Sequence, residues 1–462
     1  MRRIIIIAAL LLGVCAVSAS AQVAQRPTRP YRGLFGGGPP PDPNRTRHEL
    51  TFTASILGGY DDYVTPTAIG DEPAPDIQNG FSTNASAALE YFYGRAARSF
   101  SADLQAISNA YYSSGVSPTL GADMTLAYSS DVGRRGHFGV TQDLSYEPTL
   151  VLGAFAPLAA DVESSALPET GTGVQSGFVD QRSWSAITTV TAERRWTPRR
   201  TTSANASYSQ RTYLDALGFD STTISADVRQ TAGLSRTTSL DASYRYADTD
   251  LERATGGTLP LTDHTVEVGL SYSKRLSPTR QIQLSGGGGA SYIKTESETD
   301  FSPLDYWTPS GHATVRIDVG RSWAVGADYR RAVSVLQGLT LQSFPTNAVS
   351  VRVDGTMSRR IEVAASTAYS TGQSGAGETG GDFRAYSGDV QLRFALARCC
   401  ATSVTYDYYI YRLNDIPDVP SGIPSNYDRN AIRVGFTLWL PLYGSYGQAE
   451  GGRTRERAPA GR

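Results

Sequence analysis

The segment AIRVGFTLWLPL, Ala431–Leu442, alternates between two kinds of side chain along its length. Every second residue is large and apolar, and these residues are Ile432, Val434, Phe436, Leu438 and Leu440. Between them stand Arg433, Gly435, Thr437 and Trp439. A period of two is the repeat of a β-strand whose two faces meet different surroundings, whereas a helix repeats about every 3.6 residues. One face of this strand therefore meets an apolar medium, and the face that carries an arginine meets water.

The same alternation recurs from His48 onward. Examples are LTFTASIL at 50–57, HTVEVGLSYS at 264–273, HATVRIDVG at 312–320 and GDVQLRFAL at 388–396. We count about eighteen such segments of roughly ten residues, joined alternately by short Arg-rich and longer acidic connections. A propeller blade has a similar repeat length but needs four short strands in each repeat. Only two strands fit here, so the pattern favours one long antiparallel meander.

Arginine and tyrosine recur at a fixed spacing in four of these strands. The pairs are Arg200 and Tyr208, Arg236 and Tyr244, Arg321 and Tyr329, and Arg398 and Tyr406. Eight residues of a tilted strand rise roughly 20 Å, close to the thickness of the apolar band of a membrane barrel. An arginine that reaches phosphate and a tyrosine with a wet hydroxyl suit the two edges of that band. The sequence therefore predicts an all-β, transmembrane, antiparallel up-and-down β-barrel of about 18 strands, with long extracellular loops and short periplasmic turns.

A membrane barrel must close on itself, because an open sheet edge would leave unpaired backbone groups in hydrocarbon. The last strand is therefore expected to pair with the first, HELTFTASILGGY at 48–60. Both termini then lie on the side of the short turns, which is the periplasm.

Strand parity assigns the charged and aromatic side chains to the two faces. The predicted pore-lining residues are Glu90, Asp103, Asp123, Asp227, Arg229, Asp241, Arg245, Glu267, Arg316, Asp318, Asp328, Arg330, Arg352, Asp354, Asp389, Arg393, Asp407 and Arg433. The predicted aromatic girdle consists of Tyr91, Tyr128, Tyr208, Tyr244, Tyr272, Tyr329, Tyr369 and Tyr406. Acidic residues outnumber basic ones in the lumen, which predicts a mild preference for cations. Alternatively, Asp and Arg on neighbouring strands pair across the wall and only stiffen it.

The N-terminus reads as a secretory signal. Arg2 and Arg3 precede an apolar run over 4–17, and Ala19-Ser20-Ala21 is a small-residue cleavage site. A lipoprotein signal through Cys15 is the alternative, although Val14 stands where a small residue is expected. We expect a signal peptide at 1–21, a disordered Pro/Gly/Arg-rich periplasmic lead at 22–47, the barrel at 48–442, and a polar periplasmic tail at 443–462.

The strand quoted first also carries a known pattern. Arg433, Gly435, Leu438 and Leu440 follow the order polar, any, Gly, any, any, hydrophobic, any, hydrophobic. This order resembles the C-terminal assembly signal of bacterial outer-membrane β-barrel proteins. The resemblance implies the outer membrane of a Gram-negative-type bacterium and recognition by the barrel-assembly machinery. The repeated Arg turns and Tyr-x-Tyr strand ends over about 48–442 also resemble porin-like barrels and the barrels associated with exosortase and exopolysaccharide loci.

Three functions fit these features. The first is passive diffusion of small hydrophilic solutes, with outer-membrane lipid as the surroundings. The second is export of exopolysaccharide or another polymer with periplasmic partners, and the third is a structural or surface-interaction barrel. Composition does not point to nucleic acid, since hydrophobic residues make up 40%, charged residues 19%, and the net charge is −2. Only four His are present and no Gly-x-Ser-x-Gly elbow occurs, so no enzyme, cofactor or metal site is predicted.

Several segments leave two interpretations open. The long connection at 147–181 either constricts the lumen or is an exposed loop. Gly286 and Gly288 fall on the lipid face, where they mark either self-association or strand bending.

Two further features are local. Asp61 and Asp62 are assigned to an acidic outer loop, which either bridges divalent ions to anionic lipid or is simply solvated. Cys399 and Cys400 form either an adjacent disulfide or two thiols, with no function inferred for them.

Overall fold

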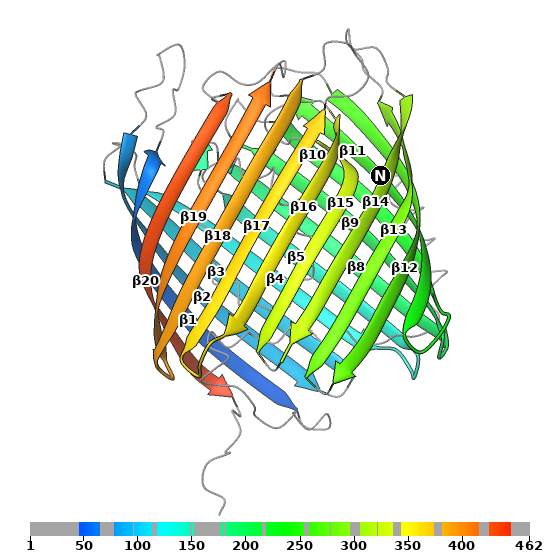
Figure 1. Ribbon diagram of the computed structural model, residues 1–462, viewed down its shortest axis with the longest axis horizontal. Coiled ribbons are helices and arrows are strands. Elements are labelled where there is room, and N and C mark those ends of the chain that lie inside the picture. Colours follow the sequence, from blue (N-terminus) through cyan, green and yellow to red (C-terminus); the bar gives the residue numbers. More distant parts are fainter. Residues whose placement is uncertain are drawn as a thin grey trace, which may run out of the picture.

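The computed structural model consists of β-strands that run obliquely around a barrel (Figure 1). It describes residues 46–64, 78–95, 97–112, 118–147, 150–151, 177–179, 182–214, 219–253, 258–277, 279–295, 305–320, 322–335, 343–373, 381–414 and 425–444. The first ten strands are β1 (Arg47–Val64), β2 (Gln78–Arg95), β3 (Arg98–Tyr111), β4 (Thr119–Asp131), β5 (Gly136–Glu147), β6 (Leu150–Val151), β7 (Gly177–Val179), β8 (Ser183–Thr197), β9 (Arg200–Tyr213) and β10 (Phe219–Gly233). The others are β11 (Thr238–Arg253), β12 (Thr258–Ser277), β13 (Arg280–Thr295), β14 (Asp305–Val319), β15 (Trp323–Val335), β16 (Ser343–Thr356), β17 (Ile361–Gln373), β18 (Asp382–Ala397), β19 (Cys400–Asn414) and β20 (Asn426–Gly444).

The barrel is a single closed sheet of 18 strands, made by β1–β5 and β8–β20. Each strand pairs antiparallel with the next along the chain, and β6 and β7 form a separate small ladder. The ring closes where β1 pairs antiparallel with β20, from Glu49 opposite Gly444 to Asp61 opposite Ala431. The predicted fold class, and the pairing of the last strand with the first, are confirmed.

The strands are longer than the sequence pattern suggests. We expected roughly ten residues, whereas the shortest strand of the barrel, β5, has 12 and β12 has 20. The apolar alternation marks only the part of a strand that faces an apolar medium. The strands continue beyond it with polar residues on both faces, as with Asp61 and Asp62 of β1.

The expected domain limits fall close to the ends of the barrel. β1 begins at Arg47, and β20 continues to Gly444, two residues beyond the expected limit at Leu442. The predicted signal peptide, nearly all of the lead, and the tail after Gly444 lie outside the described residues. Most of the predicted constricting loop at 147–181 also lies outside the described residues. The described parts of it are Glu147 and the strands β6 and β7, which pair with each other. Among the described residues, no helix is long and apolar enough to cross a membrane.

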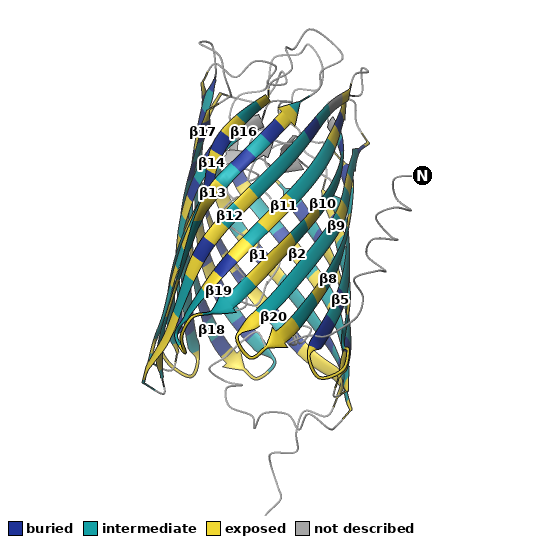
Figure 2. Cartoon of the chain, turned by 90° about the vertical axis from the view of Figure 1, so that its right-hand side faces the viewer, coloured by how far each residue is buried: buried dark blue, intermediate teal, exposed yellow. Residues whose placement is uncertain are grey.

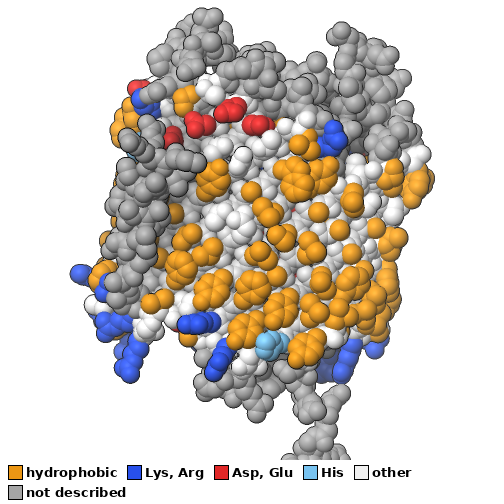
Figure 3. All heavy atoms as spheres, turned by 180° about the vertical axis from the view of Figure 1, so that it is seen from behind, with side chains coloured by type: hydrophobic (Ala, Val, Ile, Leu, Met, Phe, Trp, Pro, Cys, Tyr) orange, Lys and Arg blue, Asp and Glu red, His pale blue; other side chains and the backbone are white. Residues whose placement is uncertain are grey.

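The two faces of the barrel differ sharply in character. On β20 the outward Ile432, Val434 and Phe436 are 51%, 55% and 42% exposed, whereas the inward Arg433 is 3% exposed. Buried and exposed positions alternate along many strands (Figure 2). Figure 3 shows hydrophobic side chains spread over the outer surface, with acidic groups near the upper rim and most of the basic groups near the lower rim. A closed sheet that is apolar outside and charged inside suits hydrocarbon around it and water within.

Two glycines bring β1 and β20 close together at the closing seam. A Cβ atom on Gly435 would lie 2.6 Å from Leu57 Cγ, and one on Gly59 would lie 2.5 Å from Arg433 Cγ. Both positions face inward, where side chains from the opposite strand fill the space. The glycine of the predicted assembly signal therefore has a packing role in the closed ring.

Gly435→Val is expected to lower the free energy of unfolding by about 1–3 kcal/mol, because the added side chain overlaps Leu57. Gly58→Val is the matched control, since nothing lies within 4 Å of a Cβ atom at that outward position of the same seam. Both variants are refolded into phospholipid vesicles and unfolded in guanidinium. Equal stability of the two variants would contradict the assignment.

Candidate functional site: the inward-facing wall

The inward face carries all of the predicted pore-lining residues. Residues opposite each other in adjacent strands share a face, so the register around the ring can be followed from Arg433 to every other position. By this register, the inward set contains Glu90, Asp103, Asp123, Asp227, Arg229, Asp241, Arg245, Glu267, Arg316, Asp318, Asp328, Arg330, Arg352, Asp354, Asp389, Arg393 and Asp407. Their role in lining a conducting pore stays a prediction.

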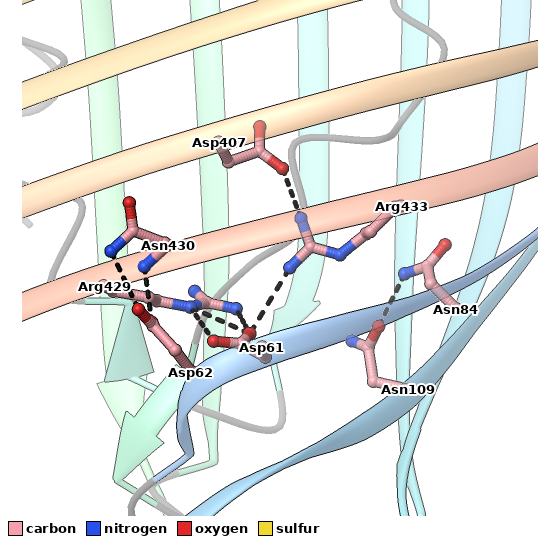
Figure 4. Close-up of polar contacts among 8 residues, drawn as sticks. All are labelled: Asp61, Asp62, Asn84, Asn109, Asp407, Arg429, Asn430 and Arg433. Carbon is pink, nitrogen blue, oxygen red and sulfur yellow. Dashed lines mark hydrogen bonds and ion pairs between the residues drawn. The ribbon is translucent and has the colours of Figure 1, made fainter.

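A cluster of charged side chains joins three strands at the closing seam (Figure 4). The Arg429 Nε of β20 donates to both carboxylate oxygens of Asp61 on β1, at 2.8 and 2.9 Å. The Arg433 Nη2 lies 3.5 Å from the same carboxylate, and its Nη1 forms an ion pair with Asp407 on β19. The Asp61 side chain is 0% exposed and that of Arg433 is 3% exposed. We call Asp61, Asp407, Arg429 and Arg433 the seam cluster.

The assignment of Asp61 and Asp62 to an outer loop was wrong. Both lie in β1, where Asp61 points inward to the seam cluster. Asp62 points outward and accepts hydrogen bonds from the backbone N–H and the side-chain amide of Asn430, at 2.6 and 2.8 Å. The alternation of β1 contained the missing signal, because extending its parity from Leu57 to Asp61 places that carboxylate inside.

Other inward charges are also paired across the wall. Arg393 Nη1 lies 3.3 Å from Glu362, and its Nη2 donates to Gln391 at 2.9 Å. Asn205 donates to Asp227 at 2.8 Å. Thr51 donates to Glu90 at 3.2 Å, and Ser366 donates to Asp389. Arg393 with Glu362 and Arg433 with Asp407 are acid–arginine pairs between neighbouring strands, the kind of pair that the sequence left as an alternative.

The wall is packed on one side of the barrel and open on another. The inward Arg393 of β18 and Arg433 of β20 are buried, whereas the inward Arg229 of β10 and Arg245 of β11 are exposed. An inward side chain that is exposed requires solvent space inside the ring. That space borders the β10–β11 wall, and sequence parity alone could not distinguish it from the packed side.

Each of the four histidines has a polar side-chain partner. Inside the barrel, His312 Nδ1 lies 3.2 Å from Glu267, and His137 Nδ1 lies 3.3 Å from Asp131. His264 and His48 contact tyrosine hydroxyls, at 2.9 and 3.3 Å. Within the described residues, no group of three or more His, Cys, Asp or Glu is arranged to hold a metal ion.

The predicted girdle tyrosines all lie on the outward face of the barrel. Tyr208, Tyr244, Tyr329, Tyr369 and Tyr406 lie on strands that rise from the short turns, and Tyr91, Tyr128 and Tyr272 on strands that return to them. Tyr406 donates to Asn430 at 2.7 Å, and Tyr329 to Asn347 at 3.1 Å. Apolar rings with paired hydroxyls suit two interfacial belts, which remain a prediction.

The remaining predicted positions lie near the seam and the turns. In β20 Arg433 and Gly435 point inward, while Leu438 and Leu440 point outward. Gly286 and Gly288 of β13 face outward, as expected, and their part in self-association stays a prediction. Cys399 and Cys400 are joined by a disulfide in the turn between β18 and β19.

No protein-family model matches the chain, and no curated protein matches it in sequence. Solved structures match over most of its length. OccK11 (OpdR) of Pseudomonas aeruginosa has a TM-score of 0.43 and 12% identity, covering 86% of this chain and 96% of that chain. OccK2 (OpdF) of the same organism, in complex with glucuronate, has a TM-score of 0.43 and 9% identity, covering 86% and 98%. The siderophore receptor PirA of Pseudomonas aeruginosa has a TM-score of 0.41 and 11% identity, covering 85% and 80%.

At these identities the likeness concerns the barrel fold alone. The closed ring of 18 strands, apolar outside and charged inside, has the architecture of a transmembrane β-barrel. Its place in the outer membrane stays a prediction.

Asp61→Asn is expected to lower the free energy of unfolding by about 3 kcal/mol, because it leaves two buried guanidinium groups without their shared carboxylate. Asp62→Asn is the neighbouring control, because the Asp62 carboxylate accepts hydrogen bonds from Asn430 and its change should cost about 1 kcal/mol. Heat-induced mobility shifts in detergent give the two midpoints. A larger loss for the Asp62 variant would refute the importance of the seam cluster.

Proposed function

We propose that the barrel is a water-filled channel for passive diffusion of small hydrophilic solutes across the outer membrane. The observation that carries this proposal is that Arg229 and Arg245 are exposed to solvent inside a closed ring whose outer face is apolar. A ring of 18 strands encloses more volume than side chains alone fill. Polar groups that remain wet inside it supply a path for hydrated solutes.

We further propose a mild preference for cations, because carboxylates outnumber guanidinium groups among the predicted pore-lining residues. The ion pairs of Asp61 with Arg429, Asp407 with Arg433 and Glu362 with Arg393 neutralise charge on the packed side of the wall. The exposed Arg229 and Arg245 are positive groups beside the open space, and they oppose the carboxylates there. Their charge should therefore limit how strongly cations are favoured.

The double variant Arg229→Glu/Arg245→Glu is expected to raise the cation-to-anion permeability ratio roughly twofold or more, since focused wall charge acts strongly on permeant ions. Reversal potentials in planar bilayers under a salt gradient measure the ratio. Arg412→Glu makes the same kind of change at an exposed outward position and should leave the ratio unchanged.

The same recordings test the channel itself. Steady ohmic steps from the wild-type protein support passive diffusion. A barrel that opens only when periplasmic partners are added would instead support polymer export. A barrel that never conducts would support a structural or surface-interaction role.

We also propose that the barrel-assembly machinery recognises β20 through Arg433, Gly435, Leu438 and Leu440. The outward Leu438 and Leu440 and the inward Arg433 and Gly435 lie on the strand that closes the ring. Recognition of this strand would couple insertion to closure, which is the step that removes the last unpaired strand edges.

A further inference from the structure

Three neighbouring turns at the periplasmic rim bring arginines together below the outward face. They are the turns that join β4 to β5, β8 to β9, and β10 to β11. Arg195 N–H donates to the Arg135 carbonyl at 3.1 Å, and Gly233 N–H donates to the Arg199 carbonyl at 2.6 Å. Backbone hydrogen bonds therefore hold adjacent turns side by side. The proposed channel function makes no use of this surface.

A tryptophan forms the centre of this surface. Trp196 is 47% exposed, and the guanidinium carbon of Arg194 lies 3.7 Å from the centroid of its ring. Arg135 Nη1 donates to the Trp196 carbonyl at 2.9 Å. Trp196 Nε1 donates to Thr202 at 2.8 Å, and Thr202 in turn donates to Gln230. The Trp196 ring is thus held in place by Thr202 of β9, which is itself bonded to Gln230 of β10. The Arg194 guanidinium lies over that ring.

The charge of this surface is positive. Arg200 lies on the outward face of β9 and is exposed, beside the turn that carries Arg199. Asp131 of β4 and Glu193 of β8 lie on the inward face, where Asp131 pairs with His137. None of the described outward residues of β5, β8 and β9 is acidic. An anion that approaches from outside meets guanidinium groups and no described carboxylate on these three strands.

The surface above the arginines is apolar. Val140 of β5 and Val190 of β8 are opposite each other on the outward face, and Phe138 lies one step nearer the turn. A ligand that uses both regions needs an anionic group at one end and hydrocarbon at the other. A soluble anionic polymer would use the arginines alone.

We propose that Arg194, Arg200 and Trp196, whose ring Thr202 holds in place, form a binding site for the phosphate headgroup of an anionic phospholipid in the periplasmic leaflet. The phosphate lies between the two guanidinium groups, whose N–H donors match its oxygens. The indole lies at the level of the headgroup, and the acyl chains lie along Val190 and Val140. The site anchors the barrel at one defined position on its periplasmic rim.

Native mass spectrometry of the full-length barrel tests this proposal, with phosphatidylglycerol and phosphatidylcholine added in equal amounts. The wild-type protein should retain phosphatidylglycerol more strongly. Arg194→Gln/Arg200→Gln should weaken that retention by about fivefold for each guanidinium removed, leaving phosphatidylcholine unchanged. If the double variant does not fold, Arg200→Gln alone gives the same test at an exposed position. Its retention of phosphatidylglycerol should fall about fivefold.

Arg359→Gln/Arg360→Gln is the matched control, because it removes two exposed arginines from the turn between β16 and β17. This control should retain phosphatidylglycerol almost as the wild type does. Equal retention of both lipids by the wild type, or an equal loss in the control, would overturn the site. Conductance should be unchanged in either variant, so this test fails or succeeds independently of the channel proposal.

Discussion

Backbone hydrogen bonding is the constraint from which the rest of this structure follows. Hydrocarbon offers no partner to an exposed N–H or C=O, so a sheet that crosses it must have no free edge. The pairing of β1 with β20 removes the two edges that an open sheet of 18 strands would have. Gly435 and Gly59 permit that pairing, since a Cβ atom at either position would overlap the opposite strand.

The seam cluster makes one register of closure more favourable than its neighbours. A shift of one residue exchanges the two faces of a strand, so it would move Arg429 and Arg433 toward lipid and Asp61 away from them. Buried ion pairs add little net stability compared with apolar packing, but an unpaired buried charge is costly. The cluster therefore acts mainly against wrong registers. It joins residues separated by 368 positions in the chain, which meet only when the ring closes.

Strand parity predicted the two faces well, because a period of two leaves each residue only one of two directions. It therefore placed Arg433 and Asp407 inside and Tyr406 outside without any tertiary information. Parity could not give the ends of the strands, since both faces become polar where a strand leaves the apolar band. It also could not separate the packed Arg393 from the exposed Arg245, because that difference depends on what lies across the barrel.

The outward charges show how this barrel divides its surfaces between different tasks. Outward carboxylates such as Asp62, Asp248 and Asp428 lie near the loop end of their strands, whereas Arg200 and the other turn arginines lie at the opposite end. In the predicted membrane these groups face two different headgroup layers, and the sheet separates them from the interior. Inward charges are screened by water in the open space but are strongly coupled where the wall is packed. In the proposed channel, conduction depends on the wet groups beside β10 and β11, while the stability of the barrel depends on the buried groups at the seam.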